Sequence, residues 1–162
     1  MGRRAAAIAG LAEWRPLRVW DRPMFMLEAC AQLAAEALAD AGIEKGEVDG
    51  LVIPPVWESP MFGPSAAAEY LGIRANFGEV VDLGGASGAG MVWRAAAAIE
   101  VGACDTCLVL CPTLPPPPPE PGRMCMPAYL GGDAWRSPRG QFEIPAGLVA
   151  ATPSFAMRTN RH

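Results

Sequence analysis

Histidine is almost missing from this chain of 162 residues, because the one histidine is His162 at the very end. A serine nucleophile is usually activated by a histidine base, so the sequence offers little from which to build a hydrolytic triad. Positive charge is also scarce, since the formal net charge is −4 and the arginines are scattered. Binding to nucleic acid or to an anionic membrane surface is therefore not expected.

A long apolar run is missing as well. The richest stretch, Ala86 to Cys111, is interrupted by an arginine and two carboxylates, so it cannot cross a bilayer as one helix. The opening "MGRRAAAIAGLAEW" resembles a secretory signal, but its apolar part is short and Glu13 ends it, which favours a first β-strand. We expect a cytoplasmic protein.

Cysteine occurs five times, and an odd number without a secretory signal favours free thiols in a reducing compartment. Three of the cysteines are spaced C-x2-C-x3-C, a pattern that could hold a metal ion. No fourth ligand is evident and two of the three fall on an expected buried strand, so small buried side chains are the favoured interpretation and no metal is expected. The cysteines are Cys30, Cys104, Cys107, Cys111 and Cys125.

Apolar runs and punctuating glycines and prolines predict alternating strands and helices. The order β-α-β-α-β-α-β and the continuous apolar strands indicate an α/β layered fold with a mostly parallel sheet flanked by helices. Strands are expected at Arg4–Ala12, Gly50–Ile53, Glu79–Leu83 and Thr106–Cys111, and helices at Met24–Gly42, Ser65–Leu71 and Ser87–Val101.

The composition changes after Pro112, so we divide the chain into an α/β core at residues 1–112 and a second part at residues 113–162. The second part contains five consecutive prolines, Pro115 to Pro119, which favour a stiff polyproline II segment. A spacer is favoured over a ligand for an SH3-type domain, because no basic anchor flanks the prolines. A last helix is expected from Pro153 onward.

A glycine-rich turn, "VDLGGASGAG" at Val81–Gly90, lies between an expected strand and an expected helix. Its glycines do not fit a dinucleotide fingerprint, and no lysine stands where a phosphate loop needs one. Gly85–Ala89 reads G-x-S-x-A, close to the turn that presents a nucleophilic serine, but Ser87 has no histidine to activate it. From the residues alone, nucleotide binding and serine hydrolysis are both disfavoured.

Several segments, taken in order, resemble the N-terminal half of thiolases, in particular the branch related to sterol-carrier-protein thiolases. Together they cover nearly the whole chain, and their order and spacing carry the likeness rather than any single motif. The segments are "AAIAGLAEW", "MLEACAQLAAEALADAGIEKGEVDGLVI", "EYLGI", "GGASGAGMVWRAAAAIEVGACDTCLVL" and "GQFEIPAGLVAATPSFAMRTNRH".

This resemblance implies a fold of two similar halves, each with a five-stranded sheet flanked by helices, and usually a dimer. It also implies an acyltransferase that forms or cleaves a carbon–carbon bond next to an acyl-CoA thioester, here in lipid or sterol side-chain metabolism. Coenzyme A would then arrive as part of the substrate, and no separately bound cofactor is expected.

The chain departs from the family at the active-site turn. Where thiolases carry Cys-Ala-Ser-Gly, this chain has Gly85, Ala86, Ser87 and Gly88, preceded by Gly84. The nucleophile position is therefore Gly85, and no acyl-enzyme can form there. The family's second half, with its histidine and second cysteine, and the fifth strand of the first half have no counterpart, so we expect an incomplete protein that is inactive alone. The alternative is a non-catalytic subunit or a retro-aldolase-type component, as a homodimer or with an OB-fold partner.

In thiolases the loop domain helps to bind coenzyme A, so Arg136 and Arg139 are the expected contacts to its phosphates. The competing interpretation is a solvated loop. Further charged and aromatic side chains that invite attention are Glu58, Asp82, Asp133 and Trp135.

Overall fold

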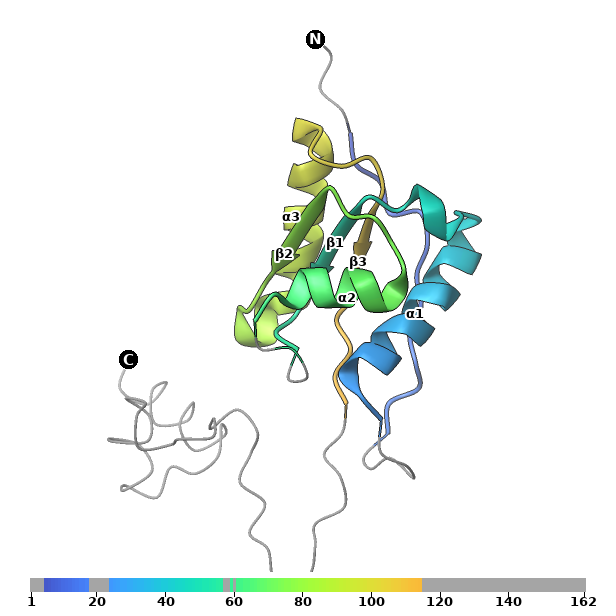
Figure 1. Cartoon of the computed structure of the whole chain (residues 1–162), viewed down its shortest axis with the longest axis vertical. Coiled ribbons are helices and arrows are strands. Elements are labelled where there is room, and N and C mark those ends of the chain that lie inside the picture. Colours follow the sequence, from blue (N-terminus) through green and yellow to red (C-terminus); the bar gives the residue numbers. More distant parts are fainter. Residues whose placement is uncertain (1–4, 18–23, 57–58, 60, 115–162) are drawn as a thin grey trace, which may run out of the picture. The chain divides into compact units, whose positions relative to one another are not determined.

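Helices and strands alternate through the part of the chain that the computed structural model describes, which is residues 5–17, 24–56, 59 and 61–114 (Figure 1). The α/β layered fold with a mostly parallel sheet is confirmed. The elements are α1 (Met26–Ala41), η1 (Lys45–Glu47), β1 (Gly50–Ile53), α2 (Gly63–Leu71), β2 (Phe77–Val80), η2 (Gly84–Ala86), α3 (Ser87–Val101) and β3 (Cys107–Val109).

The sheet has the order β2-β1-β3, with both pairs parallel and β1 in the centre. The bounds of β1 and of α3 are those expected from the sequence. In contrast, β2 begins two residues before the expected Glu79 and ends at Val80, and β3 is shorter than expected. The start of β2 is set by pairing, because the carbonyl oxygen of Asp49 accepts hydrogen bonds from the N–H groups of Asn76 (2.6 Å) and Phe77 (3.2 Å).

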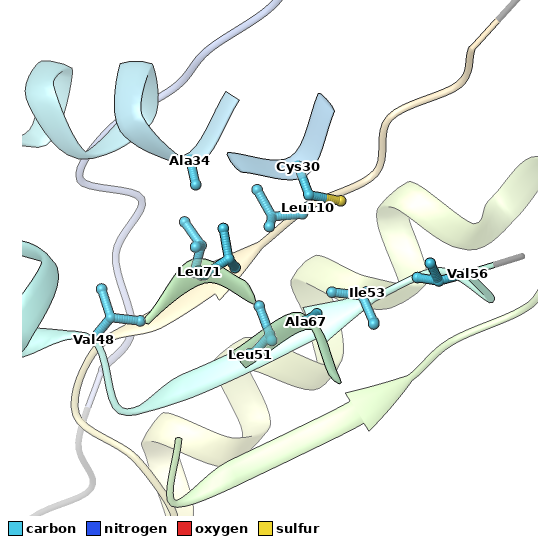
Figure 2. Close-up of a cluster of buried hydrophobic side chains, with 10 residues drawn as sticks. Cys30, Ala34, Val48, Leu51, Ile53, Val56, Ala67, Leu71 and Leu110 are labelled. Carbon is cyan, nitrogen blue, oxygen red and sulfur yellow. The ribbon is translucent and has the colours of Figure 1, made fainter. Parts of the chain in front are cut away.

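Alternate residues of β1 face opposite sides of the sheet, and each side has its own core. Leu51 and Ile53 pack with side chains of α1 and α2, as Figure 2 shows for Ala34 and Ala67. Val52, one residue along, packs instead with side chains of α3. The described core therefore has three layers, with α1 and α2 on one face of the sheet and α3 on the other (Figure 1).

The helices end where the sequence predicts. Each of α1, α2 and α3 is followed by a glycine with a left-handed backbone, namely Gly42 (φ 66°), Gly72 (φ 67°) and Gly102 (φ 78°). Glycine adopts this conformation without the steric cost that a Cβ would add, and its N–H bonds back to the last turn of the helix. Pro64 stands in the first turn of α2, where its missing N–H costs nothing.

The expected first strand at Arg4–Ala12 is wrong. The described part of this stretch forms no strand, and Ile8 and Leu11 are 77% and 73% exposed. The N–H of Leu11 donates to Asp40 Oδ2 (2.9 Å), so the segment runs along α1 instead of joining the sheet. A cavity of about 430 Å³ lies between this segment and β3. A strand needs a neighbouring ladder, and the cavity separates this segment from the free edge of β3.

The division at residues 112 and 113, the proline run and the last helix lie at or beyond the end of the described residues and stay predictions. Among the helices that the structure describes, none is both long and apolar enough to span a bilayer.

Candidate functional site

The glycine-rich turn follows β2 and leads into the N-terminus of α3, at the carboxyl ends of the parallel strands. In open α/β sheets ligands bind at the carboxyl ends of the strands. Gly84 has a left-handed backbone (φ 58°), and the N–H of Ala86 donates to the carbonyl oxygen of Leu83 (3.2 Å). The chain thus turns tightly within η2 before α3 begins.

The hydroxyl of Ser87 holds this turn closed. Its oxygen accepts a hydrogen bond from the N–H of Leu83 (2.9 Å), and its proton is donated to the carbonyl oxygen of Gly84 (2.8 Å). Both contacts are local, which is how serine commonly stabilises turns and helix starts. Ser87 therefore has a positioning role in the structure, and this geometry gives no support to the serine-nucleophile interpretation.

Asp82 also acts on the turn, through a hydrogen bond from the N–H of Gly84 to its Oδ1 atom (3.2 Å). The sequence singled out this residue without giving it a role, and the structure places it as a second positioning group. With Gly84 occupied in this way, the N–H of Gly85 has no acceptor within the described residues. Free N–H groups at the N-terminus of a helix are donors that an anionic ligand oxygen can accept.

Open space surrounds Gly85, the residue to which the resemblance in the sequence assigns the nucleophile position. A Cβ built on Gly85 would meet no atom within 4 Å, and the same holds for Gly88. The backbone of Gly85 is not left-handed, so a side chain there would be accommodated without strain. The turn can therefore offer backbone N–H groups and the positive end of the α3 dipole to an anionic oxygen, but it has no nucleophile of its own.

Exposed apolar side chains also lie near the carboxyl ends of the strands. Met61 and Phe62 are 68% and 78% exposed, and Leu83 is 59% exposed. The start of α2 is close to the end of β2, because a Cβ on Gly63 would stand 3.5 Å from Val80 Cγ2. Phe62 also has a positive φ of 58°, which is uncommon for a bulky residue. The surroundings of the turn thus offer apolar surface beside the polar N–H groups.

Two of the cysteines, Cys104 and Cys107, lie near the amino ends of β1 and β3. Cys104 and Cys107 both lie against Gly50, while Cys111 is exposed beyond the end of β3. Burial raises the pKa of the Cys104 thiol, and the nearby charge of Asp49 raises it further; burial raises the pKa of Cys107 to about 12. No cluster of three or more metal-ligating side chains occurs in the described part of the chain.

Asp49 is a residue whose role the sequence did not reveal. Burial raises the pKa of its carboxyl, but hydrogen bonds from the N–H groups of Thr106 and Asp105 outweigh this, so the pKa is lowered overall. These bonds run to Oδ1 at 2.9 Å each. The only hint in the sequence was the position of Asp49 directly before a buried strand.

The other predicted site residues cannot be placed around the turn, because they lie outside the described residues. They are Glu58, Cys125, Asp133, Trp135, Arg136, Arg139 and His162.

No protein-family model matches the chain, and no curated protein sequence matches it. Among solved structures, the chain is similar to a variant of OleA from Xanthomonas campestris, a member of the thiolase superfamily, with a TM-score of 0.53 and 24% identical residues. The match covers 60% of this chain and 30% of the OleA chain. The fold is thus thiolase-like, as the resemblance in the sequence predicted, and the matched part spans less than a third of OleA.

Proposed function

We propose that this chain carries the substrate-facing turn of a thiolase-like acyltransferase-family protein that acts on an acyl-CoA thioester without forming an acyl-enzyme. The observation that carries the proposal is the N–H of Gly85, which has no acceptor among the described residues and lies at the N-terminus of α3. Glycine at this position supplies a backbone donor but no nucleophile.

The chemistry follows from what such a donor can do. When a carbon–carbon bond next to a thioester breaks heterolytically, the electron pair moves onto the thioester oxygen as an enolate. A fixed N–H group at a helix N-terminus stabilises that negative charge, which is the main contribution of an oxyanion site. Retro-aldol cleavage of a β-hydroxyacyl chain needs this stabilisation and a base, but no covalent intermediate. The base has to come from residues other than those of the turn.

The acyl chain and the nucleotide part of the substrate would contact different groups. The exposed side chains of Met61, Phe62 and Leu83 offer apolar surface to an acyl chain near the turn. Arg136 and Arg139 remain the proposed contacts to the phosphates of coenzyme A. A role in lipid or sterol side-chain metabolism is what the resemblance implies. We propose a cytoplasmic location because the free cysteines of the described residues are compatible with a reducing compartment.

The test is a titration of the isotopically labelled chain with a thioether analogue of an acyl-CoA, followed by amide NMR. We expect the largest shifts at Gly84 to Gly88, with the Gly85 amide moving downfield. Free coenzyme A and a free fatty acid serve as controls, because each lacks one half of the ligand. Saturation with shifts confined to other parts of the chain would exclude the turn as the binding site, and no shift at millimolar analogue would exclude binding.

A second candidate function is a non-catalytic subunit that completes its sheet with a partner chain. Two hydrogen bonds join β1 to the residues that flank β3. The N–H of Gly50 donates to the carbonyl oxygen of Thr106 (3.0 Å), and the N–H of Leu110 donates to the carbonyl oxygen of Val52 (3.0 Å). Because backbone groups alternate along a strand, those of Cys107 and Val109 point away from β1, toward the cavity.

The cavity of about 430 Å³ lies beside β3, along the backbone groups that do not bond to β1. An extended apolar segment of a partner, such as an OB-fold protein or a second copy, could pair there by strand addition.

Native mass spectrometry of the protein purified from its own cells separates the two candidates. A chain of 17.0 kDa in a complex of fixed stoichiometry would favour the subunit role. A chain of 17.0 kDa without any partner, together with saturable binding of the acyl-CoA analogue, would favour the first proposal.

A further inference from the structure

The pair Cys104 and Cys107 is not used by the proposed function. The two sulfur atoms lie on the same side of Gly50, where a Cβ would stand 2.7 Å from Cys104 Sγ and 3.1 Å from Cys107 Sγ. Any side chain at residue 50 would occupy the place where the sulfurs meet. Glycine there leaves that place to the two thiols.

The two residues between the cysteines are fixed. Asp49 Oδ1 accepts hydrogen bonds from the N–H of Asp105 (2.9 Å) and the N–H of Thr106 (2.9 Å). These hydrogen bonds fix the backbone between the two cysteines. The fixed backbone keeps their side chains close to each other. Small buried hydrophobes would not need this arrangement, because one thiol does not require a second one beside it.

The two thiols differ in their access to small molecules. Cys104 is 2% exposed, whereas Cys107 is partly exposed and lines the cavity beside β3. A small oxidant in the cavity would meet Cys107 first. Cys104 would then be the neighbouring thiol able to react with the oxidised sulfur.

We propose that Cys104 and Cys107 form an intramolecular disulfide when the protein meets a hydroperoxide, so that the pair is a site of reversible covalent modification. The thiolate of Cys107 attacks the hydroperoxide oxygen, which breaks the O–O bond and gives a sulfenic acid and an alcohol or water. The Cys104 sulfur then attacks the sulfenic sulfur and expels water. In sum, two thiols are oxidised, one hydroperoxide is reduced, and the chain loses two hydrogen atoms.

The surroundings of the pair determine its rate. Burial raises the pKa of Cys107 to about 12, and the negative charge of Asp49 also raises the pKa of both thiols. Only the thiolate is nucleophilic, so oxidation is slow near neutral pH and accelerates about tenfold per pH unit below that pKa. The disulfide needs a sulfur separation of about 2.05 Å, so the two free thiols must move together when it forms.

The test uses the full chain with Cys30, Cys111 and Cys125 replaced by alanine, so that only the pair remains. After hydrogen peroxide at pH 9 and trapping with N-ethylmaleimide, we expect an intact mass lower by two hydrogen atoms and no maleimide. The matched control carries Cys107→Ser in addition, and it should keep one thiol that is labelled or oxygenated. Because the raised pKa of Cys107 slows the folded chain, the exposure lasts about a thousandfold longer than full oxidation of the urea-unfolded chain requires. Two labelled thiols at its end would overturn the proposal.

Because this triple substitution could weaken the fold, the native chain provides a second measurement. Tandem mass spectrometry of its peptide spanning residues 95–123 distinguishes a Cys104–Cys107 link from a Cys107–Cys111 link. We expect the first. A link to Cys111, or covalent dimers of the native chain, would contradict the proposal.

Discussion

Gly85 and Gly50 are both glycines at critical points of the sheet, but their surroundings are opposite. A side chain at Gly85 would meet no atom within 4 Å, whereas one at Gly50 would stand 2.7 Å from a cysteine sulfur. Gly85 lies in open space near the carboxyl ends of the strands, where ligands bind open α/β sheets. The space beside Gly50 is filled by two thiols. The comparison shows that the same residue can mark an available site or a fully packed one, and that only the atoms around it distinguish the two.

The largest effect is expected from Gly85→Cys, which places a thiol in the open position that we propose corresponds to a thiolase nucleophile. The introduced thiol would lie at the start of α3, where the helix dipole and free N–H groups lower a thiol pKa. We expect it to be acylated by an acyl-CoA at least tenfold faster than any native cysteine, as measured by intact mass and peptide mapping.

Gly88→Cys is the matched control, because this position is also open and also near the N-terminus of α3. It should react slowly, since the N–H of Gly85 is not placed to stabilise the oxyanion formed there. Equal rates for the two introduced thiols would show that the turn itself contributes nothing.

The next effect is expected from filling the packed position. Gly50→Ala should lower the free energy of unfolding by about 1–3 kcal/mol, because the sulfur of Cys104 must move to admit the methyl group. Gly85→Ala should change it by less than about 0.5 kcal/mol. Urea unfolding of both variants measures the difference, and similar losses at the two positions would refute the comparison.

Ser87→Ala should have a smaller effect on stability, about 1 kcal/mol, because it removes two local hydrogen bonds at an exposed turn. Amide exchange at Leu83 should increase, since its N–H loses its acceptor. A Ser87→Thr variant keeps the hydroxyl and should preserve protection. Unchanged exchange in the alanine variant would show that the hydroxyl does not hold the turn.

The smallest effect is a dependence of stability on pH that comes from Asp49. Its pKa in the folded chain lies below the ordinary value of 3.8, so the carboxylate stabilises the fold fully above that value and loses this contribution as the pH falls through the folded pKa. In Asp49→Asn the free energy of unfolding should therefore fall less steeply as the pH drops below 3.8. It should also speed oxidation of Cys107 at pH 8, because a charge that raises the thiol pKa is gone.

Local signals in the sequence predicted the helices well. The glycines after α1, α2 and α3 and the proline at the start of α2 act within one turn, so their effect can be read without the fold. The expected first strand was wrong for the opposite reason. A strand exists only with a partner, and residues 5–17 lie along α1 with a cavity between them and β3.

Some features of the candidate site could likewise be predicted from the sequence, and others could not. The glycine pattern located the turn, and the assignment of the nucleophile position to Gly85 from the resemblance stays a prediction. The hydrogen bonds of Ser87 and Asp82 could not be foreseen, because they depend on how tightly the chain turns. The grouping of Asp49 with Asp105 and Thr106 joins residues more than fifty positions apart, and no local pattern encodes it.

Asp49 also has a consequence for how the sheet assembles. Its carbonyl oxygen sets the first rung between β1 and β2, and its N–H and carboxylate set the first rung between β1 and β3. Parallel strands form late in folding, because long loops must close before any contact is gained. One residue that takes part in both pairings lets the second pairing start aligned. A substitution of Asp49 removes the carboxylate but keeps the backbone groups, so it should weaken the β1–β3 rung and slow folding more than it speeds unfolding.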